Sequence, residues 1–308
     1  MMRLLDVELR RALSRRAVRG LIGLCMLGIV IGAVIAFFVS KPAFDQASAL
    51  SRATAARQAD MTRCTSGSDG PTPPPGMDRT EYCDQFFPPV SQYVSDKRFH
   101  MERLWGPRDP VLAGLSPILL IGALIAGATA LGAEWRHGTI ATLLTWEPRR
   151  LRVMAAKLAA VALAAFVIGV LLQAFLVLAL LPAGMARGTT DGMTAVWWRG
   201  LAGGVLRIGL MTSAAAVFSA CVASVGRNTA AAIGVAFGYL IVVENAVRGL
   251  RPQWQRWLVG NNGATLVLGK KVQIAHAKGM MGASVILGVY LAVIVAVAVT
   301  SFVRRDVT

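Results

Sequence analysis

Apolar residues along this chain come in long, almost unbroken blocks. An α-helix rises about 1.5 Å per residue, so about 20 apolar residues cross the hydrocarbon layer of a bilayer. Six blocks meet or approach this length: residues 20–40, 111–133, 158–182, 200–224, 230–247 and 282–303. The fifth block is short and Arg207 interrupts the fourth, but six spans remain the interpretation that the pattern favours. We therefore expect an all-α integral membrane protein.

The segment before the first block has a different pattern. Within residues 1–19, Leu5, Leu9 and Leu13 recur every four positions among six arginines. This spacing predicts an amphipathic helix on the inner membrane surface, its arginines facing anionic headgroups. The alternative is a plain positively charged anchor. The first apolar block is longer than a signal-peptide core and no A-x-A site follows, so we interpret residues 20–40 as an uncleaved span.

The placement of positive charge predicts the orientation of the spans. The chain has 32 Lys and Arg against 16 Asp and Glu, a net charge of +16. Fourteen of the basic residues lie in the segments expected on one side: 1–19, 134–157, 225–229 and 304–308. The short segments expected on the other side, 183–199 and 248–281, hold eight. The positive-inside rule then places both ends of the chain in the cytoplasm of a multi-pass cell (plasma) membrane protein, against the six basic residues of 248–281. Because the charge follows the membrane topology, we expect a lipid membrane and not a nucleic acid as its partner.

The long segment 41–110 is expected outside the cell as a helical hairpin. Residues 43–62 can continue the first span as a helix, and the Gly- and Pro-rich residues 63–89 predict an irregular tip. Val90, Val94, Met101 and Leu104 follow at near-heptad spacing, which predicts a helix returning to the membrane.

Two cysteines, Cys64 and Cys83, flank the tip of this hairpin with 18 residues between them. They lie on the side where oxidation is possible, so the spacing predicts a disulfide that stabilises the hairpin by about 3 kcal/mol. The alternative is two free thiols. The other two cysteines, Cys25 and Cys221, fall within predicted spans.

Motifs of catalysis are missing. The sequence contains no Walker A, HExxH or GxSxG motif, and its histidines, His100, His137 and His276, fall in three separate segments. The stretch GATLVLGKK has its glycines six apart and lacks Ser or Thr after the lysine, so it is no phosphate loop. We expect no catalytic residue, no metal site and no cofactor in this chain.

Two ionisable residues, Arg207 and Glu244, fall inside predicted spans near the outer interface. One interpretation is a buried ion pair or proton site. The other is an arginine that extends to the interface, with Glu244 pairing to Arg248 four residues on. The segment 248–281 that follows, with Trp254 and Trp257, predicts an interfacial or re-entrant element.

Glycine pairs at four-residue spacing predict close helix packing and hint at a dimer face. These pairs are Gly28/Gly32, Gly200/Gly204 and Gly234/Gly238.

The polar segment 134–157 separates the second and third spans. Thr139, Ile140, Leu143 and Leu144 can form two helical turns with one apolar edge, and Pro148 ends them. Such a short protruding helix suits docking into a groove of a soluble partner. The alternative is an ordinary positively charged loop.

This segment also carries a resemblance. Glu134, Gly138-Thr139, Leu143-Leu144, Pro148, Arg150 and Lys157 form a pattern similar to that of permease subunits of ABC-2-type ABC exporters. The likeness extends over most of the chain, from the amphipathic helix to the re-entrant-like element before the sixth span. It implies that residues 134–157 contact a separately encoded cytoplasmic ATPase, which binds ATP and Mg²⁺ and acts as a dimer. It also implies a second permease subunit, identical or different.

By this resemblance, Glu134 and Arg136 brace the loop, residues 139–146 form the docking helix, and the residues from Pro148 fix its exit. The implied ATPase-coupling residues are Glu134, Arg136, Gly138, Thr139, Ile140, Leu143, Leu144, Trp146, Pro148, Arg149 and Arg150. The long outer segment, larger than in short members of the family, leaves the substrate open.

The leading hypothesis is thus a permease subunit of an ABC transporter, with export as the expected direction and no catalysis of its own. One alternative is an ion-coupled secondary transporter or channel that uses Glu244 and Arg207. Another is a membrane scaffold or sensor whose outer hairpin binds a ligand or protein.

Overall fold

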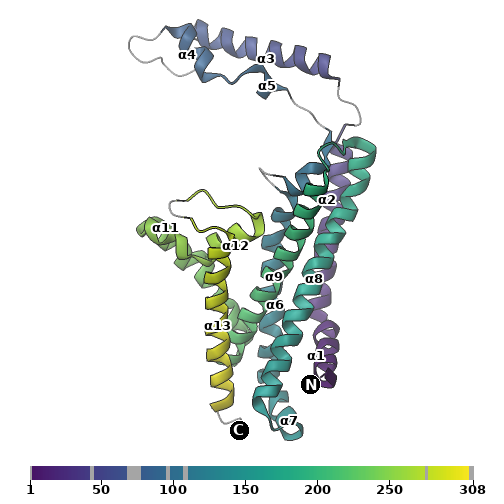
Figure 1. Ribbon diagram of the computed structural model, residues 1–308, viewed down its shortest axis with the longest axis vertical. Helices are drawn as coiled ribbons and strands as arrows, with labels where there is room; N and C mark the ends of the chain where they lie inside the picture. Colours follow the sequence, from purple (N-terminus) through teal and green to yellow (C-terminus); the bar gives the residue numbers. More distant parts are fainter. Residues whose placement is uncertain are drawn as a thin grey trace. The chain divides into compact units, whose positions relative to one another are not determined.

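A computed structural model describes residues 2–41, 45–67, 78–94, 98–106, 110–274 and 277–304, apart from the side chains at 2–4, 92, 141 and 144. Within these residues, six helices are long and apolar enough to cross a membrane. They are α2 (Arg16–Val39), α6 (Val111–Arg136), α8 (Arg150–Arg187), α9 (Ala195–Gly226), the continuous helix Thr229–Leu250 and α13 (Met280–Arg304) (Figure 1). The chain is an all-α integral membrane protein, as its apolar blocks predict.

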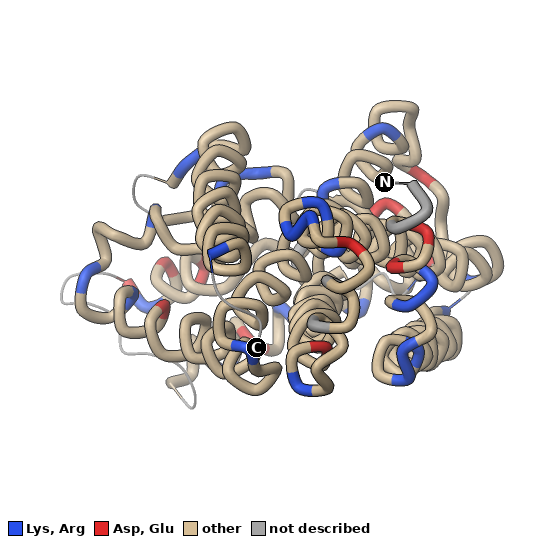
Figure 2. The backbone as a smooth tube through the Cα atoms, turned by 90° about the horizontal axis from the view of Figure 1, so that it is seen from below, with Lys and Arg blue, Asp and Glu red and all other residues tan. Residues whose placement is uncertain are grey.

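The chain divides into two compact units. The first consists of Met1–Gly32, Glu102–Ala179 and Gly192–Thr308, and the second of Ala33–Met101 and Leu180–Asp191. In the first unit, the N-terminal helix α1 (Met2–Ser14), the short helix α7 (Thr139–Trp146) and the end of α13 lie at the same end (Figure 1). Seen from that end, Lys and Arg are more frequent than Asp and Glu (Figure 2), in line with the net charge of +16.

The core of the first unit is formed by α6 and α9 packed along each other, with α13 against α9. Buried apolar side chains from α6, α8, α9 and α13 meet in one cluster that includes Leu131, Met154, Val217 and Phe302. Two serine hydroxyls of α9 add bonds between helices: Ser213 donates to the Ala162 carbonyl (2.9 Å) and Ser219 to the Leu124 carbonyl (2.6 Å). In a bilayer, such polar contacts between helices add to van der Waals packing.

The second unit contains a helical hairpin. Its first helix, α3 (Gln46–Ser66), begins at Asp45, whose carboxylate accepts a hydrogen bond from the Ala47 N–H (3.1 Å). Hydrogen bonding with Ser48, and then with the backbone, lowers the pKa of Asp45, because each bond favours the ionised form. The returning arm of the hairpin contains α4 (Arg79–Phe86).

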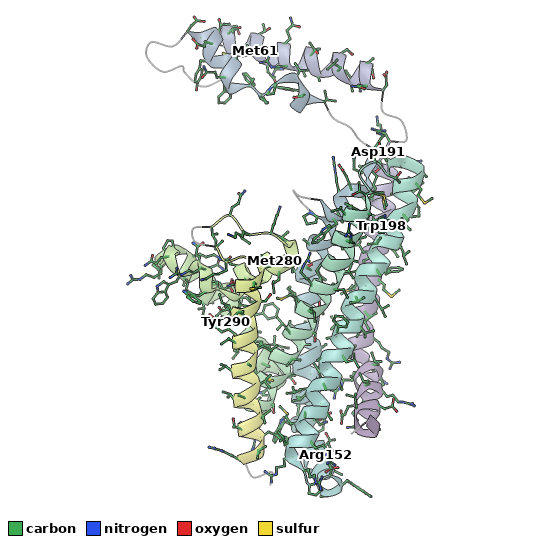
Figure 3. All side chains as sticks on the ribbon, in the orientation of Figure 1. Met61, Arg152, Asp191, Trp198, Met280 and Tyr290 are labelled. Atoms are coloured by element: carbon green, nitrogen blue, oxygen red, sulfur yellow. A yellow bond between two sulfur atoms is a disulfide. The ribbon has the colours of Figure 1, made fainter. Side chains whose placement is uncertain are left out.

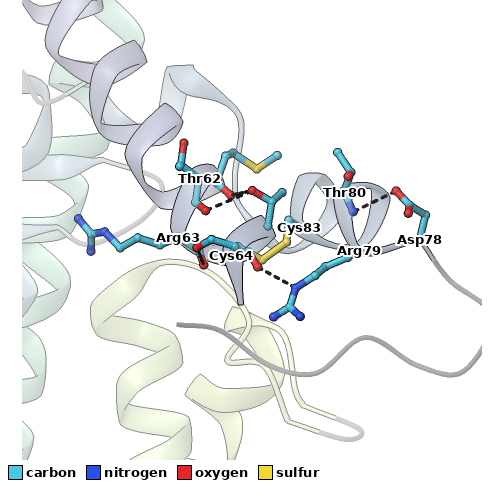
Figure 4. The surroundings of a disulfide bond; sticks show 10 residues. Thr62, Arg63, Cys64, Asp78, Arg79, Thr80 and Cys83 are labelled. Atoms are coloured by element: carbon cyan, nitrogen blue, oxygen red, sulfur yellow. Dashed lines mark hydrogen bonds between the residues drawn. A yellow bond between two sulfur atoms is a disulfide. The ribbon is translucent and has the colours of Figure 1, made fainter. Parts of the chain in front are cut away.

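A disulfide joins the two helices of the hairpin in the structure. The sulfur atoms of Cys64 and Cys83 are bonded, with Cα atoms 6.0 Å apart, a separation that disulfides commonly span (Figure 4). Arg79 donates through Nε to the Cys64 carbonyl (2.9 Å), which closes the end of α3 next to the bond. Both half-cystines are buried, so the bond is the centre of this small core.

The prediction of a helix that returns to the membrane from residue 90 onward is wrong. Among the described residues 90–94 and 98–100, one helical turn forms, α5 (Val90–Tyr93), after Pro88 and Pro89. The chain then pairs as a short parallel strand, β1 (Phe99–His100), with β2 (Gly188–Thr189), before the 3-10 helix η1 (Met101–Trp105). Backbone pairing with a distant segment overrides the local heptad spacing. The expectation of an irregular tip is also too broad, because α4 lies within residues 63–89; residues 68–77 are outside the described part.

Between the last two spans lie a 3-10 helix, η3 (Pro252–Trp257), and a short helix, α12 (Val259–Leu268), which packs against α9 and α13. The preceding span consists of α10 (Thr229–Gly238), a π-helical turn η2 (Tyr239–Val243) and α11 (Glu244–Leu250). A π-helical turn inserts a bulge into the helix and shifts the register of the residues after it. It lies directly before Glu244, a buried residue.

The glycine pairs have different surroundings. A side chain at Gly200 or Gly204 would collide with the Trp105 ring, so these two glycines make room for a side chain of the same chain. By contrast, nothing lies within 4 Å of a side chain built at Gly28, Gly32, Gly234 or Gly238.

Candidate functional site: the α7 end of the first unit

Helix α7 has the bounds that its sequence predicts, Thr139–Trp146. Gly138 precedes it with φ of +66°, a left-handed conformation that glycine adopts without strain and that reverses the chain after α6. At the other end, the Glu147 N–H closes the last turn on the Leu143 carbonyl (3.0 Å) and Pro148 follows. Two backbone-directing residues thus isolate a helix of eight residues.

One face of α7 anchors it to the helix bundle. Ile140 is 2% exposed and belongs to the same core cluster as Leu131 and Met154, with Leu143 partly buried against it. Trp146, at the end of the helix, is 86% exposed. A tryptophan this exposed on an anchored helix is unusual, because burial of its ring is strongly favourable.

Beneath α7, four charged side chains form a buried group that we call the four-charge cluster: Glu8, Arg15, Glu134 and Lys157. Lys157 Nζ lies 2.9 Å from Glu8 Oε1 and 2.6 Å from Glu134 Oε2. Arg15 Nη2 lies 3.2 Å from the other oxygen of Glu134, Oε1. The side chains of Lys157, Glu8 and Glu134 are 3%, 7% and 8% exposed. The cluster therefore ties α1 and the start of α2 to α6 and α8.

Arg15 differs from its expected position. The sequence pattern places it on a face toward lipid headgroups, whereas its side chain turns inward and donates to two α6 carbonyls, Thr129 and Ala130 (2.9 Å to the latter). Because Arg15 lies in the short break between α1 and α2, its side chain can reach the last turns of α6. A carbonyl oxygen has two lone pairs, so each of these two can accept from Arg15 in addition to its bond within the helix.

A groove of about 500 Å³ opens beside this cluster. Its walls come from α1, the end of α6 and α7, and its lining residues are Arg11, Arg15, Ala133, Glu134, His137, Thr139, Thr142, Leu143 and Trp146. Apolar Leu143 and Trp146 thus face a basic and polar wall from α1. The groove thus brings the predicted α7 residues together with α1, a helix at the start of the chain.

The other residues of the predicted coupling set whose side chains are described do not line this groove. Arg136, Pro148 and Arg149 are exposed, and Arg150 begins α8 and donates to the Val303 carbonyl at the end of α13 (3.3 Å). Figure 3 places Arg152 at the same end; it pairs with Glu147 (3.6 Å). The side chain of Leu144 is outside the described part.

The two ionisable residues of the spans bind opposite ends of α12. Glu244, 2% exposed, accepts from the Gly260 N–H through Oε1 (2.6 Å) and pairs with Arg248 through Oε2 (2.8 Å). Any side chain at Gly260 would collide with this carboxylate. Of the two interpretations of Glu244 given by the sequence, the structure has the pair with Arg248, four residues further along the helix.

At the other end of α12, Arg207 donates through Nε to the Leu266 carbonyl (3.1 Å), and its guanidinium lies 5.2 Å from the centre of the Trp105 ring. The anion is therefore at the N-terminus of α12 and the cation at its C-terminus, the arrangement that a helix dipole favours. We call Glu244, Arg207 and the ends of α12 the α12 clamp.

Sequence reasoning missed Glu8, Arg11 and the inward role of Arg15. Two acidic residues, Asp6 and Glu8, lie among the arginines of this helix, and no local signal separates them: Asp6 is exposed and pairs with Arg10, whereas Glu8 is buried against Lys157.

A comparison with protein families agrees with the resemblance. The family model described as ABC-2 family transporter protein matches residues 5–307, nearly the whole chain. The chain belongs to the ABC-2 transporter family. No curated protein matches this ABC-2 family member, and neither does any solved structure.

Membership gives the chain its place in a larger assembly. An ABC-2 family protein is the membrane component, the permease subunit, of an ABC transporter and works with an ABC ATPase subunit. The family is a transport component that is generally not itself catalytic. The α7 groove and the α12 clamp are thus parts of a permease.

Proposed function

We propose that this permease couples ATP hydrolysis by a separate ATPase to export of a substrate, through the α7 groove. The observation that carries the proposal is the exposed Trp146 on a helix whose other face is fixed in the core. A partner that pushes on α7 moves α6 and α8 with it, since Ile140 and the four-charge cluster join these elements. ATP and Mg²⁺ bind the partner, and this chain holds no cofactor.

In this proposal, the α7 end faces the cytoplasm of the plasma membrane, together with both ends of the chain. The fourteen Lys and Arg of the segments on that side support the orientation. The second unit then lies outside the cell, where the Cys64–Cys83 bond can persist. Mass spectrometry of a non-reduced digest tests the bond, and a recovery of both cysteines as free thiols would contradict it.

The permease acts as a dimer with a second permease subunit in this proposal. The open glycine faces at Gly28/Gly32 and Gly234/Gly238 support it, since small residues let helices of two subunits approach closely. Identical and different second subunits both satisfy this requirement.

Purification in mild detergent from the native host tests the assembly. We expect an ATPase with a Walker motif among the co-purifying chains, and its absence would overturn the proposal.

Trp146→Ala tests the contact itself. Exposed tryptophans at protein interfaces are frequent hot spots, so we expect ATPase binding to weaken about thirtyfold, with the fold intact because Trp146 is 86% exposed. Trp198→Ala, which removes another exposed tryptophan at the start of α9, is the matched control. If both variants bind the ATPase equally well, α7 is not part of the interface with the ATPase.

A further inference from the structure

The segment between the last two spans joins the ends of two consecutive membrane helices, Leu250 and Met280. It therefore lies at a membrane surface, whichever side that surface faces. Residues 248–281 contain six Lys and Arg and no Asp or Glu. One of these cations, Arg248, is neutralised by Glu244 within the α12 clamp. The segment as a whole keeps a positive charge.

Two of these cations lie against the ring of Trp257. Lys278 Nζ and the Arg256 guanidinium each lie 5.5 Å from the centre of the Trp257 ring. The backbone of Trp257 is held in turn, because Tyr290 of α13 donates its hydroxyl to the Trp257 carbonyl (3.1 Å). Figure 3 shows Tyr290 and Met280 on the first half of α13, beside this segment. Positive charge is thus fixed at one place next to the membrane.

Large apolar side chains stand out from the same segment. Leu250 is 79% exposed, Trp254 59% and Met281 83%. Arg251 and Lys271 are exposed in the same segment, and the Trp254 N–H closes a turn on the Arg251 carbonyl (3.0 Å). Apolar side chains that project beside cations are typical of a surface that enters the boundary between headgroups and acyl chains.

We propose that this surface, formed by Leu250, Arg251, Trp254, Trp257, Lys271 and Lys278, binds anionic phospholipid headgroups in preference to zwitterionic ones. The apolar side chains enter the interface and the cations meet the lipid phosphates. A positive segment on the outer side also opposes the positive-inside rule, so a binding role gives a reason for its charge. The proposal is independent of ATPase docking.

Fluorescence quenching of the whole purified chain in nanodiscs tests the preference. Phosphatidylcholine discs would contain a fixed mole fraction of brominated lipid, either phosphatidylglycerol or phosphatidylcholine. The difference between the wild type and Trp254→Phe/Trp257→Phe isolates the two tryptophans. We expect several-fold stronger quenching of this signal by brominated phosphatidylglycerol. Equal quenching by both lipids, or quenching by neither, would overturn the proposal.

Two charge variants locate the effect. Arg251→Gln/Lys271→Gln should remove most of this several-fold preference for the anionic lipid, because each cation near a charged membrane surface adds affinity. Arg199→Gln/Arg304→Gln removes the same charge from two exposed positions elsewhere and should retain the preference. A preference that survives the first pair would contradict the assignment.

A last measurement separates a lipid from a free anion. The quenching measurement would be repeated in inorganic phosphate and in sodium chloride at equal ionic strength. We expect the same modest screening by both salts. Loss of the preference in phosphate alone would show a site for a soluble anion and would overturn the lipid proposal.

Discussion

The four-charge cluster and the α12 clamp differ in what balances their buried charges. In the cluster, Lys157 lies between two carboxylates from different helices, Glu8 and Glu134, so charge is balanced by charge. In the clamp, Glu244 and Arg207 bind backbone groups at the two ends of one short helix, and the ion pair of Glu244 is with Arg248 on its own helix. Removing one member therefore has different consequences. The cluster would retain an excess of buried charge of one sign. In the clamp, a backbone group of α12 would lose its partner, and loss of Glu244 would also release Arg248, which is exposed.

The largest effect is expected for Lys157→Met in the cluster. Glu8 and Glu134 would both lose their nearest cation and keep only the longer contacts with Arg11 (3.3 Å) and Arg15 (3.2 Å). Breaking a buried ion pair costs about 3 kcal/mol or more. The midpoint of thermal unfolding in detergent should fall by roughly 10 °C. Arg149→Met, which removes an exposed cation nearby, is the control and should change little. The triple variant Glu8→Gln/Glu134→Gln/Lys157→Met should recover part of the loss, because no buried carboxylate remains.

An equal midpoint for Lys157→Met and Arg149→Met would mean that the cluster does not hold α1, α6 and α8 together. The expected difference in stability between changes in the cluster and changes in the α12 clamp would then be absent.

A smaller effect is expected for Glu244→Gln in the clamp. The amide oxygen can still accept from the Gly260 N–H. We therefore expect a loss of about 1–2 kcal/mol from the missing charge. Hydrogen exchange at the first amides of α12 should accelerate. Glu244→Leu, which offers no acceptor, should cost more than Glu244→Gln. A loss as large as that of Lys157→Met would show that charge, not the backbone bond, dominates here.

The smallest effect is expected for Arg207→Met. It removes one hydrogen bond to the Leu266 carbonyl and the contact with the Trp105 ring, together about 1 kcal/mol. Faster hydrogen exchange should be confined to the last turn of α12. Arg199→Met, an exposed arginine on the same helix, is the control. Faster exchange at the first turn as well would show that the two ends of α12 do not act separately.

Helix α7 shows how much of the candidate site the sequence can predict. Its bounds follow from Gly138 and Pro148, residues whose backbone preferences act locally. Which of its side chains are buried and which are exposed cannot be predicted as directly from the sequence. The apolar edge of Ile140 and Leu143 turns toward the core, and Trp146 becomes the exposed side chain. Which face packs inward depends on the angle at which α6 and α8 meet.

The segment after Val90 shows the opposite outcome. Near-heptad spacing favours a helix there, but β1 pairs with β2, a strand from a distant part of the sequence. The stability of such a pairing depends on where the end of α8 lies, and local spacing carries no information on that position. The expectation of a continuous helix fails for this reason.

Six spans, the family and the short helix between the second and third spans can all be predicted from the amino-acid sequence, since each depends on apolar length or local backbone preference. Helix packing alone brings Glu8 to Lys157, which lie 149 residues apart, and Arg207 to the Leu266 carbonyl. A charge buried in a membrane protein must find a partner. Which partner it finds is set by the tertiary structure, because packing brings together residues that no local pattern connects.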